Sequence, residues 1–543
     1  MTLTSTEYPS ALATATDPGT EALAHPARGG SVDGASELVA QLLARPAGQV
    51  SASTYETARL VSLAPWLTGH AQRVRWLLDC QHADGGWGPG DGYQLVPTLS
   101  ATEALLAVLR TRTVSGLDEV ARAAGRGLTA LSGWLGAATP LPDTPALDLI
   151  VPALVEAVNE HLDRHGHPPT GRSAGRLGLP VGMTGARLAA VRHQAVAGRS
   201  LDVKLHHALE VLGPLARAAR GVTPQPNGAV GASPAATAAW LGGPDRPDGQ
   251  PAPVSYLERV VAGGDRLAPC TTPITVFERS WVVSTLARAG MPVAASPDLV
   301  GSLTADLTEA GTATSPGLPP DADTTSVTLY ALLRLGVPVD PDCLWRYDIG
   351  TGFCTWPGED GISVTTNAHV LDVLGEYLAG GAAVPGPAAD RYRSAVHRLE
   401  GLLLDQQHDD GTWHDRWHAS PYYATLCCAL ALAGYGRTPA VAPALARAAR
   451  WVLATQRPDG SWGRWHGTPE ETAYALHLLA VAGGEPARAA LGRGRAHLLR
   501  VADQPGDAQL WHDKDLYQPT MIVRSAVLAA DHLTAGDTAL TRR

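Results

Sequence analysis

The chain has 543 residues, of which 45% are hydrophobic and 17% are charged, so it is long enough to fold around more than one core. Its 42 Lys and Arg residues against 52 Asp and Glu residues give a net charge of −10. This balance argues against a general binding surface for nucleic acid or for an anionic membrane.

No segment approaches the roughly 18 uninterrupted apolar residues that a membrane-spanning helix needs. Residues 1–31 are rich in Thr, Pro, Gly and Ala and lack the basic start of a signal peptide, so they are predicted to be a disordered lead-in. The six cysteines form no CxxC pair and are interpreted as reduced thiols. These features predict a cytoplasmic protein without a transmembrane segment. The sequence is compatible with a homodimer but does not determine the oligomeric state.

Apolar residues three and four positions apart recur along the whole chain, which is the spacing of helices that bury one face. Most of these segments stop at Gly or at turns that contain Pro, whereas alternating strand patterns are scarce. The fold is therefore predicted to be all-α. In chain order, the clearest segments are SATEALLAVLR (100–110), LDLIVPALVEAV (147–158), ATLCCALALAG (424–434), ETAYALHLLAVAGG (471–484) and RSAVLAADHL (524–533).

A short motif of the form Q-x-x-D-G-x-W occurs in QHADGGWG (81–88), QHDDGTWH (407–414) and QRPDGSWG (456–463). Its Asp-Gly pair favours a turn, because Asp bonds its own backbone and Gly accepts positive φ. We expect the Gln amide to bond backbone groups at helix ends and the Trp to pack over the junction. Repeats of this QW type staple helix pairs in α/α-barrels of several functions, so they predict architecture more than activity.

The stretch PPDADTT (319–325) places two carboxylates, Asp321 and Asp323, at the predicted start of a helix. Asp321 follows two prolines and suits the N-cap position, and Asp323 then falls in the first turn. Free N–H groups and the helix dipole favour a carboxylate there. Taken alone, this pattern predicts helix capping.

Several further segments occur in an order that resembles the class II terpene cyclases, enzymes that protonate an isoprenoid alkene to start ring closure. The resemblance extends over most of the chain, and its strength lies in the order of the segments, since each motif alone is weak. The segments are SASTYETA (51–58), ALDLIVPALVEA (146–157), KLHHALEVLG (204–213), GASPAATAAW (231–240), ITVFERSWVVSTLARAG (274–290), PPDADTTSVTLYALLRLG (319–336), TTNAHVL (365–371), WHASPYYAT (417–425) and WHDKDLYQPTMIVRSAVLAA (511–530).

The resemblance implies two α/α-barrel domains, called γ and β, with the active site between them. It places the first β helix within residues 32–49, an inserted γ barrel at 50–268 and the remainder of the β barrel at 269–543. The chain shows no D-D-x-x-D motif on a predicted helix, since Asp409 and Asp410 lie in a turn repeat. A metal-dependent domain that removes diphosphate is therefore not expected, and the diphosphate of the substrate should be retained.

By the same resemblance, Asp323 is the proton donor and Asp321 is its hydrogen-bonded partner. Two close carboxyls do not both ionise readily, so one of them keeps a proton. Thr324 stands where the family usually has a third Asp, and its hydroxyl is expected to donate to Asp323, with Thr325 beside it. The D-x-D-T-T variant resembles drimenyl diphosphate synthases, which favours farnesyl diphosphate as the substrate. Geranylgeranyl diphosphate, giving a copalyl-type product, is the alternative.

A carbocation intermediate needs aromatic faces around it, and the chain offers several candidates near the resembling motifs. Each of these rings could equally be ordinary core packing. Asn367 and His369 could support the acid helix or assist deprotonation, and a satisfied core pair is the alternative for them. The candidate rings are Phe277, Trp281, Trp356, Tyr422, Tyr423 and Tyr517.

The diphosphate of the substrate needs cations, and Mg²⁺ is expected as a cofactor held by carboxylate oxygens near it. The candidates could also be solvated surface charges, helix caps or members of ion pairs. The candidate cations are Arg192, Lys204, Lys514 and Arg524, and the candidate Mg²⁺ ligands are Asp143, Asp148 and Glu156.

Other functions of α/α-barrels predict different residues. A zinc-dependent protein prenyltransferase needs an acid, a thiol and a His, but the acids near Cys343 lack the D-x-C spacing, and HExxH is absent. A thioester domain needs a reactive Cys in a Gly-rich turn, which none of the six cysteines offers. Two alternatives stay open, namely a glycoside hydrolase that uses Asp321 or Asp323 with a distant carboxylate, and a non-catalytic isoprenoid-binding barrel.

Overall fold

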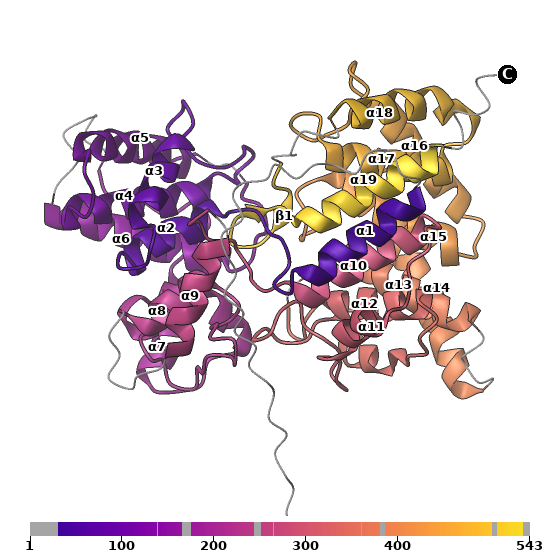
Figure 1. The fold of residues 1–543 in the computed structure, drawn as a ribbon, viewed down its shortest axis with the longest axis horizontal. Coiled ribbons are helices and arrows are strands. Elements are labelled where there is room, and N and C mark those ends of the chain that lie inside the picture. The colour runs from indigo at the N-terminus through magenta and orange to yellow at the C-terminus, as the bar shows by residue number, and fades with distance from the viewer. Residues whose placement is uncertain are drawn as a thin grey trace, which may run out of the picture.

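The computed structural model describes residues 31–137, 140–165, 175–243, 251–263, 265–359, 361–380, 386–501 and 508–535. These residues form helices joined by turns, with one hairpin of strands β1 (Trp511–His512) and β2 (Leu516–Tyr517), so the all-α prediction is confirmed (Figure 1). No described helix combines the length and the apolar character that crossing a bilayer requires. The predicted lead-in at 1–31 falls outside the described residues except for Ser31.

Five helices form a closed inner ring between residues 54 and 241, in which each helix contacts the next and the last contacts the first. Four further helices cover this ring from outside. The inner helices are α2 (Thr54–Leu63), α4 (Leu95–Thr111), α6 (Leu147–His165), the 3₁₀ helix η1 (Val203–Ala216) and α8 (Pro234–Leu241), and the outer helices are α3 (His70–Asp79), α5 (Leu117–Leu135), α7 (Ala186–Val196) and α9 (Pro251–Gly263).

A second ring of six helices closes in the same way, and its outer layer includes the N-terminal helix α1 (Ser31–Ala44). Figure 1 shows α1, in indigo, beside the yellow C-terminal helix. The inner helices are α10 (Thr275–Arg288), α12 (Ala322–Arg334), α13 (Val364–Ala379), α15 (Pro421–Tyr435), α17 (Pro469–Ala482) and α19 (Thr520–Ala535), and the other outer elements are α11 (Pro297–Thr304), η2 (Pro341–Tyr347), α14 (Pro387–Asp405), α16 (Val441–Ala454), η3 (Glu485–Ala487) and α18 (Arg488–Val501).

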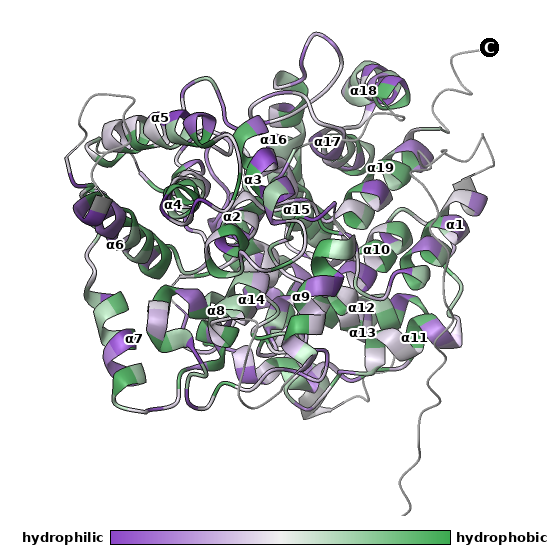
Figure 2. Cartoon of the chain, turned by 60° about the vertical axis from the view of Figure 1, so that its left-hand side comes forward, coloured by the Kyte–Doolittle hydropathy of each residue, from purple (hydrophilic) through white to green (hydrophobic). Residues whose placement is uncertain are grey.

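Each ring surrounds its own hydrophobic core. One core contains residues between 55 and 268, and the other combines residues 35–42 with residues between 270 and 530. We call residues 50–268 the γ domain and the remaining described residues the β domain. Outer helices such as α5 present one hydrophobic and one hydrophilic face, as expected for a layer between core and solvent (Figure 2).

The three QW-type repeats join neighbouring helix pairs as predicted. In the second repeat, the Gln407 amide donates to the carbonyls of Gly411 and Ala444, both at 3.0 Å. The indole of Trp413 is fully buried and donates to the Leu403 carbonyl at 2.7 Å. Equivalent bonds occur in the other two repeats. Each motif therefore satisfies backbone groups at helix ends while its indole seals the junction.

The two domains meet through the loops that precede their inner helices. Arg464, ahead of α17, pairs with Asp91, ahead of α4, at 3.1 Å. Arg416, ahead of α15, pairs with Asp143, ahead of α6, at 2.5 Å. Figure 1 shows the hairpin that contains β1, ahead of α19, lying between the domains. The N-terminal ends of the inner helices in both rings therefore point towards the domain interface.

Candidate active site

Asp321 is the N-cap of α12, as predicted, and its Oδ1 accepts a hydrogen bond from the Thr324 backbone N–H at 2.6 Å. Its Oδ2 accepts from the Thr314 hydroxyl at 3.4 Å. Burial, with the nearby charge of Asp323, raises the pKa of Asp321 to about 7. The predicted hydrogen bond between the two carboxyls is not formed, because both oxygens of Asp321 are directed at threonines.

Asp323 lies in the first turn of α12, where its Oδ1 is 2.7 Å from Nδ1 of His369 on α13. Burial acts to lower the pKa of His369, but the charge of Asp323 and the hydrogen bond to it raise that pKa to about 10. The imidazole is therefore positively charged near neutral pH and donates to the carboxylate. The structure thus brings the predicted proton donor and the predicted supporting histidine into direct contact.

The hydroxyl of Thr324 is 2.9 Å from the hydroxyl of Thr314 and forms no hydrogen bond with Asp323, which corrects the predicted donation to the acid. Thr314 lies in the turn that precedes α12, so this pair ties the helix start to that turn. Thr324 therefore influences the carboxylates through the position of the loop.

Thr325 and Asn367 hold the loops around the acid rather than the acid itself. The hydroxyl of Thr325 accepts from the Thr312 N–H at 2.9 Å and donates to the Thr312 carbonyl at 3.2 Å. Asn367 forms two hydrogen bonds with the backbone of Phe353, at 2.8 and 2.9 Å. Both side chains are buried and fully engaged, so their predicted direct roles at the acid are not supported by their contacts.

Asp415 is a further buried carboxyl near Asp321 and Asp323, and nothing in the sequence singled it out. Its Oδ1 accepts from the Ser363 hydroxyl at 2.8 Å, and its Oδ2 accepts from the Trp417 N–H at 2.9 Å. Burial raises the pKa of Asp415, and the charge of Asp323 contributes to this rise. Asp415 precedes α15, ninety-two positions from the acid motif, so only the ring closure brings them together.

An aromatic cluster adjoins the Asp323–His369 pair. The rings of Trp281 and His369 are 5.5 Å apart at nearly right angles, and the Trp281 indole donates to the Tyr423 hydroxyl at 2.8 Å. Phe277 lies 4.4 Å from Trp281 and 5.6 Å from Trp511 of the hairpin. The structure therefore brings Phe277, Trp281 and Tyr423 together, and it adds Trp511, which the sequence did not single out.

The other three predicted aromatic candidates lie outside this cluster. Tyr422 packs on Trp451 at 4.5 Å between α15 and α16, on the side of α15 away from the cluster. Trp356 packs edge-on against Trp417 at 5.2 Å and lines a cavity beside Pro319 and Pro320. Tyr517 is buried in the hairpin. Neighbouring helix positions point in different directions, so Tyr423 faces inwards where Tyr422 faces outwards.

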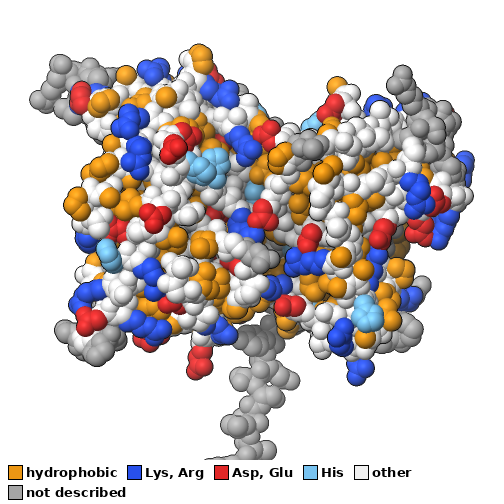
Figure 3. Space-filling model, turned by 180° about the vertical axis from the view of Figure 1, so that it is seen from behind, with side chains coloured by type: hydrophobic (Ala, Val, Ile, Leu, Met, Phe, Trp, Pro, Cys, Tyr) orange, Lys and Arg blue, Asp and Glu red, His pale blue; other side chains and the backbone are white. Residues whose placement is uncertain are grey.

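Two cavities lie near the acid motif. The first, of ≈ 50 Å³, lies inside the β ring, and its lining includes Trp281, His369 and Tyr423. The second, of ≈ 180 Å³, lies at the domain interface between Lys204 of γ and Arg346 of β, beside the prolines that precede Asp321. Figure 3 shows the molecule from behind, with a notch between its two halves at the top.

Lys514 has a structural role that contradicts the prediction of diphosphate binding. Its side chain is fully buried in the hairpin, and its ammonium lies 2.6 Å from Glu56, 2.8 Å from Glu210 and 2.7 Å from the Ser233 hydroxyl. These three acceptors use all three ammonium donors. The prediction was wrong because the sequence shows a charge but not its distant partners.

The other predicted cations differ in position. Arg192 pairs with Glu156 at 2.5 Å inside the γ domain. Arg524 donates to Gln41 at 2.8 Å between α19 and α1, outside both cavities. Lys204 reaches across the interface to the backbone of β and lines the second cavity. Of the four, Lys204 is therefore the cation placed beside the acid motif.

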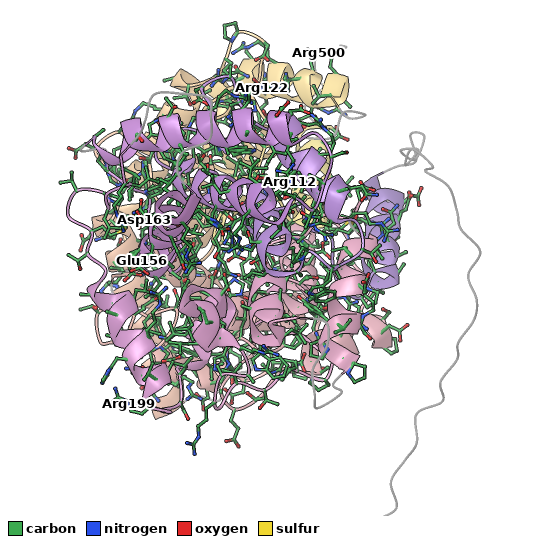
Figure 4. All side chains as sticks on the ribbon, turned by 90° about the vertical axis from the view of Figure 1, so that its left-hand side faces the viewer. Arg112, Arg122, Glu156, Asp163, Arg199 and Arg500 are labelled. Atoms are coloured by element: carbon green, nitrogen blue, oxygen red, sulfur yellow. The ribbon has the colours of Figure 1, made fainter. Side chains whose placement is uncertain are left out.

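The predicted Mg²⁺ ligands do not form a metal site. Each carboxylate is engaged by a different arginine, and the described residues contain no group of three or more His, Cys, Asp and Glu side chains able to hold a metal ion. Figure 4 labels Glu156 towards the edge of the γ domain. The ion pairs are Asp143–Arg416, Asp148–Arg187 and Glu156–Arg192.

Comparisons with known proteins support the two-barrel arrangement. The family model for the squalene-hopene cyclase C-terminal domain matches residues 360–522. The chain is 44% identical to ent-copalyl diphosphate synthase of Streptomyces sp. (strain KO-3988) over 497 residues, covering 91% of this chain and 94% of that protein. It is 42% identical to labda-7,13-dienyl diphosphate synthase of Streptomyces clavuligerus over 520 residues, covering 93% of each.

A solved structure shares the same architecture. The structure of ent-copalyl diphosphate synthase from Streptomyces platensis superimposes with a TM-score of 0.87 at 42% identity, covering 93% of this chain and 99% of that one. Together with the closed helix rings, this likeness confirms the predicted α/α-barrel fold.

Proposed function

The chain belongs to the class II terpene cyclases, and from this premise we propose that it converts geranylgeranyl diphosphate into a bicyclic copalyl-type diphosphate. The similar enzymes are named as synthases of copalyl and labdadienyl diphosphates, which supports the twenty-carbon substrate and a retained diphosphate. These relatives favour geranylgeranyl diphosphate, the alternative substrate, over farnesyl diphosphate. The farnesyl expectation rested on Thr324, whose hydroxyl bonds Thr314 instead of the acid.

The contact between Asp323 and His369 carries the proposal. Oδ1 of Asp323 accepts from the imidazolium at 2.7 Å, which leaves Oδ2 to carry the proton for the terminal alkene of the substrate. Once the proton has left, the imidazolium and the N–H groups of the first helical turn stabilise the remaining carboxylate. Stabilising the conjugate base strengthens the acid, as protonation of an alkene requires.

The aromatic cluster suits the cations that follow protonation. The faces of Phe277, Trp281 and Tyr423 offer cation–π attraction worth about 2 kcal/mol when it is desolvated. The Trp281 indole also donates to the Tyr423 hydroxyl, which occupies one lone pair of that oxygen and makes it a weaker nucleophile. The proposed sequence is protonation at the terminal alkene, closure of two rings through tertiary cations, and loss of a proton from carbon.

Turnover of the two candidate substrates tests the proposal. The purified full chain is incubated separately with geranylgeranyl and farnesyl diphosphates, with and without Mg²⁺, and the products are treated with phosphatase and identified by mass spectrometry. We expect a bicyclic twenty-carbon alcohol from geranylgeranyl diphosphate. Cyclic products from farnesyl diphosphate alone would contradict the proposed chain length, and the absence of cyclic products from both would contradict the proposed reaction.

A further inference from the structure

Glu470 is a buried carboxylate in the first turn of α17, and one of its two oxygens is held by three donors. Its Oε1 accepts from the Trp511 indole at 2.8 Å, from the Tyr474 hydroxyl at 2.9 Å and from Nε2 of His418 at 3.2 Å. Nδ1 of His418 accepts from the Ser420 N–H at 3.0 Å, so the ring hydrogen is on Nε2 and points at the carboxylate. Glu470 therefore acts only as an acceptor, as an ionised carboxylate does.

The second oxygen of Glu470 is free to accept a proton. Oε2 is buried, and none of the residues that the structure describes forms a hydrogen bond with it, although buried polar groups normally have a partner. Ala473 and Tyr474, three and four positions further along α17, line the cavity inside the β ring. Positions at this spacing share one side of a helix, so Glu470 lies on the inner face of α17, at its interface end.

Glu470 and Asp323 lie on opposite sides of the mouth of the β ring. Each is in the first turn of its helix, and these helix starts face the domain interface. In the closed ring of six inner helices, α12 and α17 are third neighbours in either direction, which places them across from each other. Figure 1 shows α12 in the lower part and α17 in the upper part of the β domain.

Aromatic rings connect the two carboxyl groups. The ring of His369, which contacts the acid, lies 5.5 Å from that of Trp281, and the Trp281 indole donates to the Tyr423 hydroxyl at 2.8 Å. Tyr423 in turn stacks on His418 at 4.6 Å, and His418 donates to Glu470. A cation that forms beside the acid is therefore bordered by π faces up to the carboxylate on the far side of the ring.

Cyclisation ends with the loss of a proton from carbon, and that proton needs an acceptor within reach. We propose that Glu470 is the base that ends the cyclisation. Its Oε2 takes a proton from a carbon next to the cationic centre, and the electron pair of the broken C–H bond forms the double bond of the product. One proton enters the substrate from Asp323 and one leaves to Glu470, which passes it to water when the product departs, so the diphosphate is untouched.

The three donors to Oε1 are positioning residues in this arrangement. They fix the carboxylate, and the place of Oε2 then determines which carbon loses its proton. The inference rests on class II activity and applies to whichever prenyl diphosphate the wild-type chain turns over. Failure of the wild type to form any cyclic product would contradict the proposed function, whereas the inference is judged by the products of variants relative to those of the wild type.

The test is Glu470→Gln, which keeps the shape of the side chain and an oxygen for the three donors but cannot accept the proton. Glu471→Gln is the matched control, because Glu471 is equally buried in the same helical turn and both of its oxygens are engaged. Its Oε1 accepts from the Ser420 hydroxyl at 2.6 Å and from the Arg464 N–H at 2.8 Å, and its Oε2 accepts from the Thr468 hydroxyl at 2.8 Å.

The full-length wild type and both variants are incubated with the prenyl diphosphate that the wild type turns over, and the products are dephosphorylated and quantified by mass spectrometry. We expect the wild-type alkene to fall below about a tenth of the cyclic products of Glu470→Gln, because general bases contribute about 10²–10⁴-fold to such steps. Isomeric alkenes, and the tertiary alcohol formed when water captures the cation, should make up the remainder. Glu471→Gln should give the wild-type products, at a lower unfolding temperature.

A wild-type product pattern from Glu470→Gln, at any rate of turnover, would overturn the inference and leave Glu470 with the structural role of holding Trp511. Loss of every cyclic product from folded Glu470→Gln would also overturn it, since water should still capture the cation. The same change of products in Glu471→Gln would do so by showing that any disturbance of this helix start alters them. Tyr474→Phe, which removes one donor to Oε1, serves if Glu470→Gln fails to fold: isomeric alkenes should then rise severalfold, and an unchanged pattern would contradict the inference.

Discussion

Among the stretches of the β domain with aspartates one residue apart, Asp321–Asp323 and Asp513–Asp515 have different surroundings. Asp321 has only neutral hydrogen-bond partners, and burial raises its pKa to about 7. Asp513 is also buried, but the charge of His207, 2.8 Å away, helps lower its pKa to about 2. The same D-x-D spacing therefore produces a proton-holding site in one place and a permanent anion in the other. The charge of the partner, more than burial, decides which.

The second pair belongs to the contact between the domains. Asp515 accepts from the Ser53 hydroxyl at 2.6 Å and from the Tyr55 N–H at 2.8 Å, and so caps α2 of the γ domain. Lys514, between the two aspartates, occupies the pocket formed by Glu56 and Glu210. Every charge of this hairpin has a partner in the other domain, whereas the pair at the acid motif is partnered within the β domain. The Asp321–Asp323 pair belongs to the candidate active site, whereas the Asp513–Asp515 pair connects the β domain to the γ domain.

Replacing the proposed proton donor, Asp323, should have the largest effect, and that effect is on turnover. Asp323→Asn keeps the shape of the side chain but cannot deliver a carboxyl proton, so turnover of geranylgeranyl diphosphate should fall by about 10²–10⁴ or more. Asp323→Asn also removes the counter-charge of the buried His369, so thermal stability should fall, and turnover is measured at a temperature at which the variant is folded. Retention of more than about a tenth of the wild-type rate would assign the donor role to another residue.

Removing the charge of Lys514, which lies between Asp513 and Asp515, should lower the stability of the folded protein. Lys514→Met leaves Glu56 and Glu210 buried without a cation, which should cost about 3–5 kcal/mol in the free energy of unfolding measured with urea. Lys204→Met is the matched control, and at its more exposed position the change should stay within about 0.5 kcal/mol. Equal losses of stability in the two variants would contradict the structural role assigned to Lys514.

Asp321 and Asp513 should contribute differently to the pH dependence of stability. The pKa of Asp321 rises from 3.8 to about 7 on folding, so the folded state binds this proton more tightly and loses stability as pH rises from about 4 to 7. Asp513, with a pKa lowered to about 2, contributes stability above pH 4 that is lost on acidification. Asp321→Asn keeps a capping oxygen and should remove the first slope, worth about 1.4 kcal/mol per pKa unit. Parallel unfolding profiles of wild type and variant between pH 4 and 8 would contradict this expectation.

The smallest effect is expected at Thr324. Thr324→Ala removes its hydrogen bond to Thr314, which should lower stability by about 1 kcal/mol. The rate with geranylgeranyl diphosphate should be nearly unchanged, because the hydroxyl does not contact Asp323. A loss of turnover close to that of Asp323→Asn would show instead that this hydroxyl acts on the acid.

Features that depend on short-range chemistry could be predicted from the sequence. The Asp-Gly turns, the buried indoles of the repeats and the N-cap at Asp321 each follow from residues close together in the chain. Phe277 and Trp281 are four positions apart in the chain, and helical spacing is enough to bring their rings together. The assignment of Asp323 as the proton donor depended, in addition, on the order of individually weak motifs along the whole chain.

Partners that ring closure brings together could not be predicted. Lys514 and Glu56 are 458 positions apart, and nothing near Lys514 in the sequence distinguishes an ion pair from a diphosphate ligand. Asp415 reaches the acid because α13 and α15 are neighbours in the ring. The choice between Tyr422 and Tyr423 depends on the rotation of α15, which packing sets and apolar spacing alone does not.

The helix ends at the interface have a consequence for how a substrate is oriented. The cap hydroxyls of α13, α15 and α17 each donate to a carboxylate, Ser363 to Asp415 and both Ser420 and Thr468 to Glu471. These carboxylates offset the partial positive charge of the helix ends, so the helix dipoles alone do not attract an anion to the mouth of the β ring. An anionic head group therefore depends on side-chain cations at the interface, such as Lys204 and Arg346, while the rings of Trp281 and Tyr423 favour positive charge deeper in the barrel.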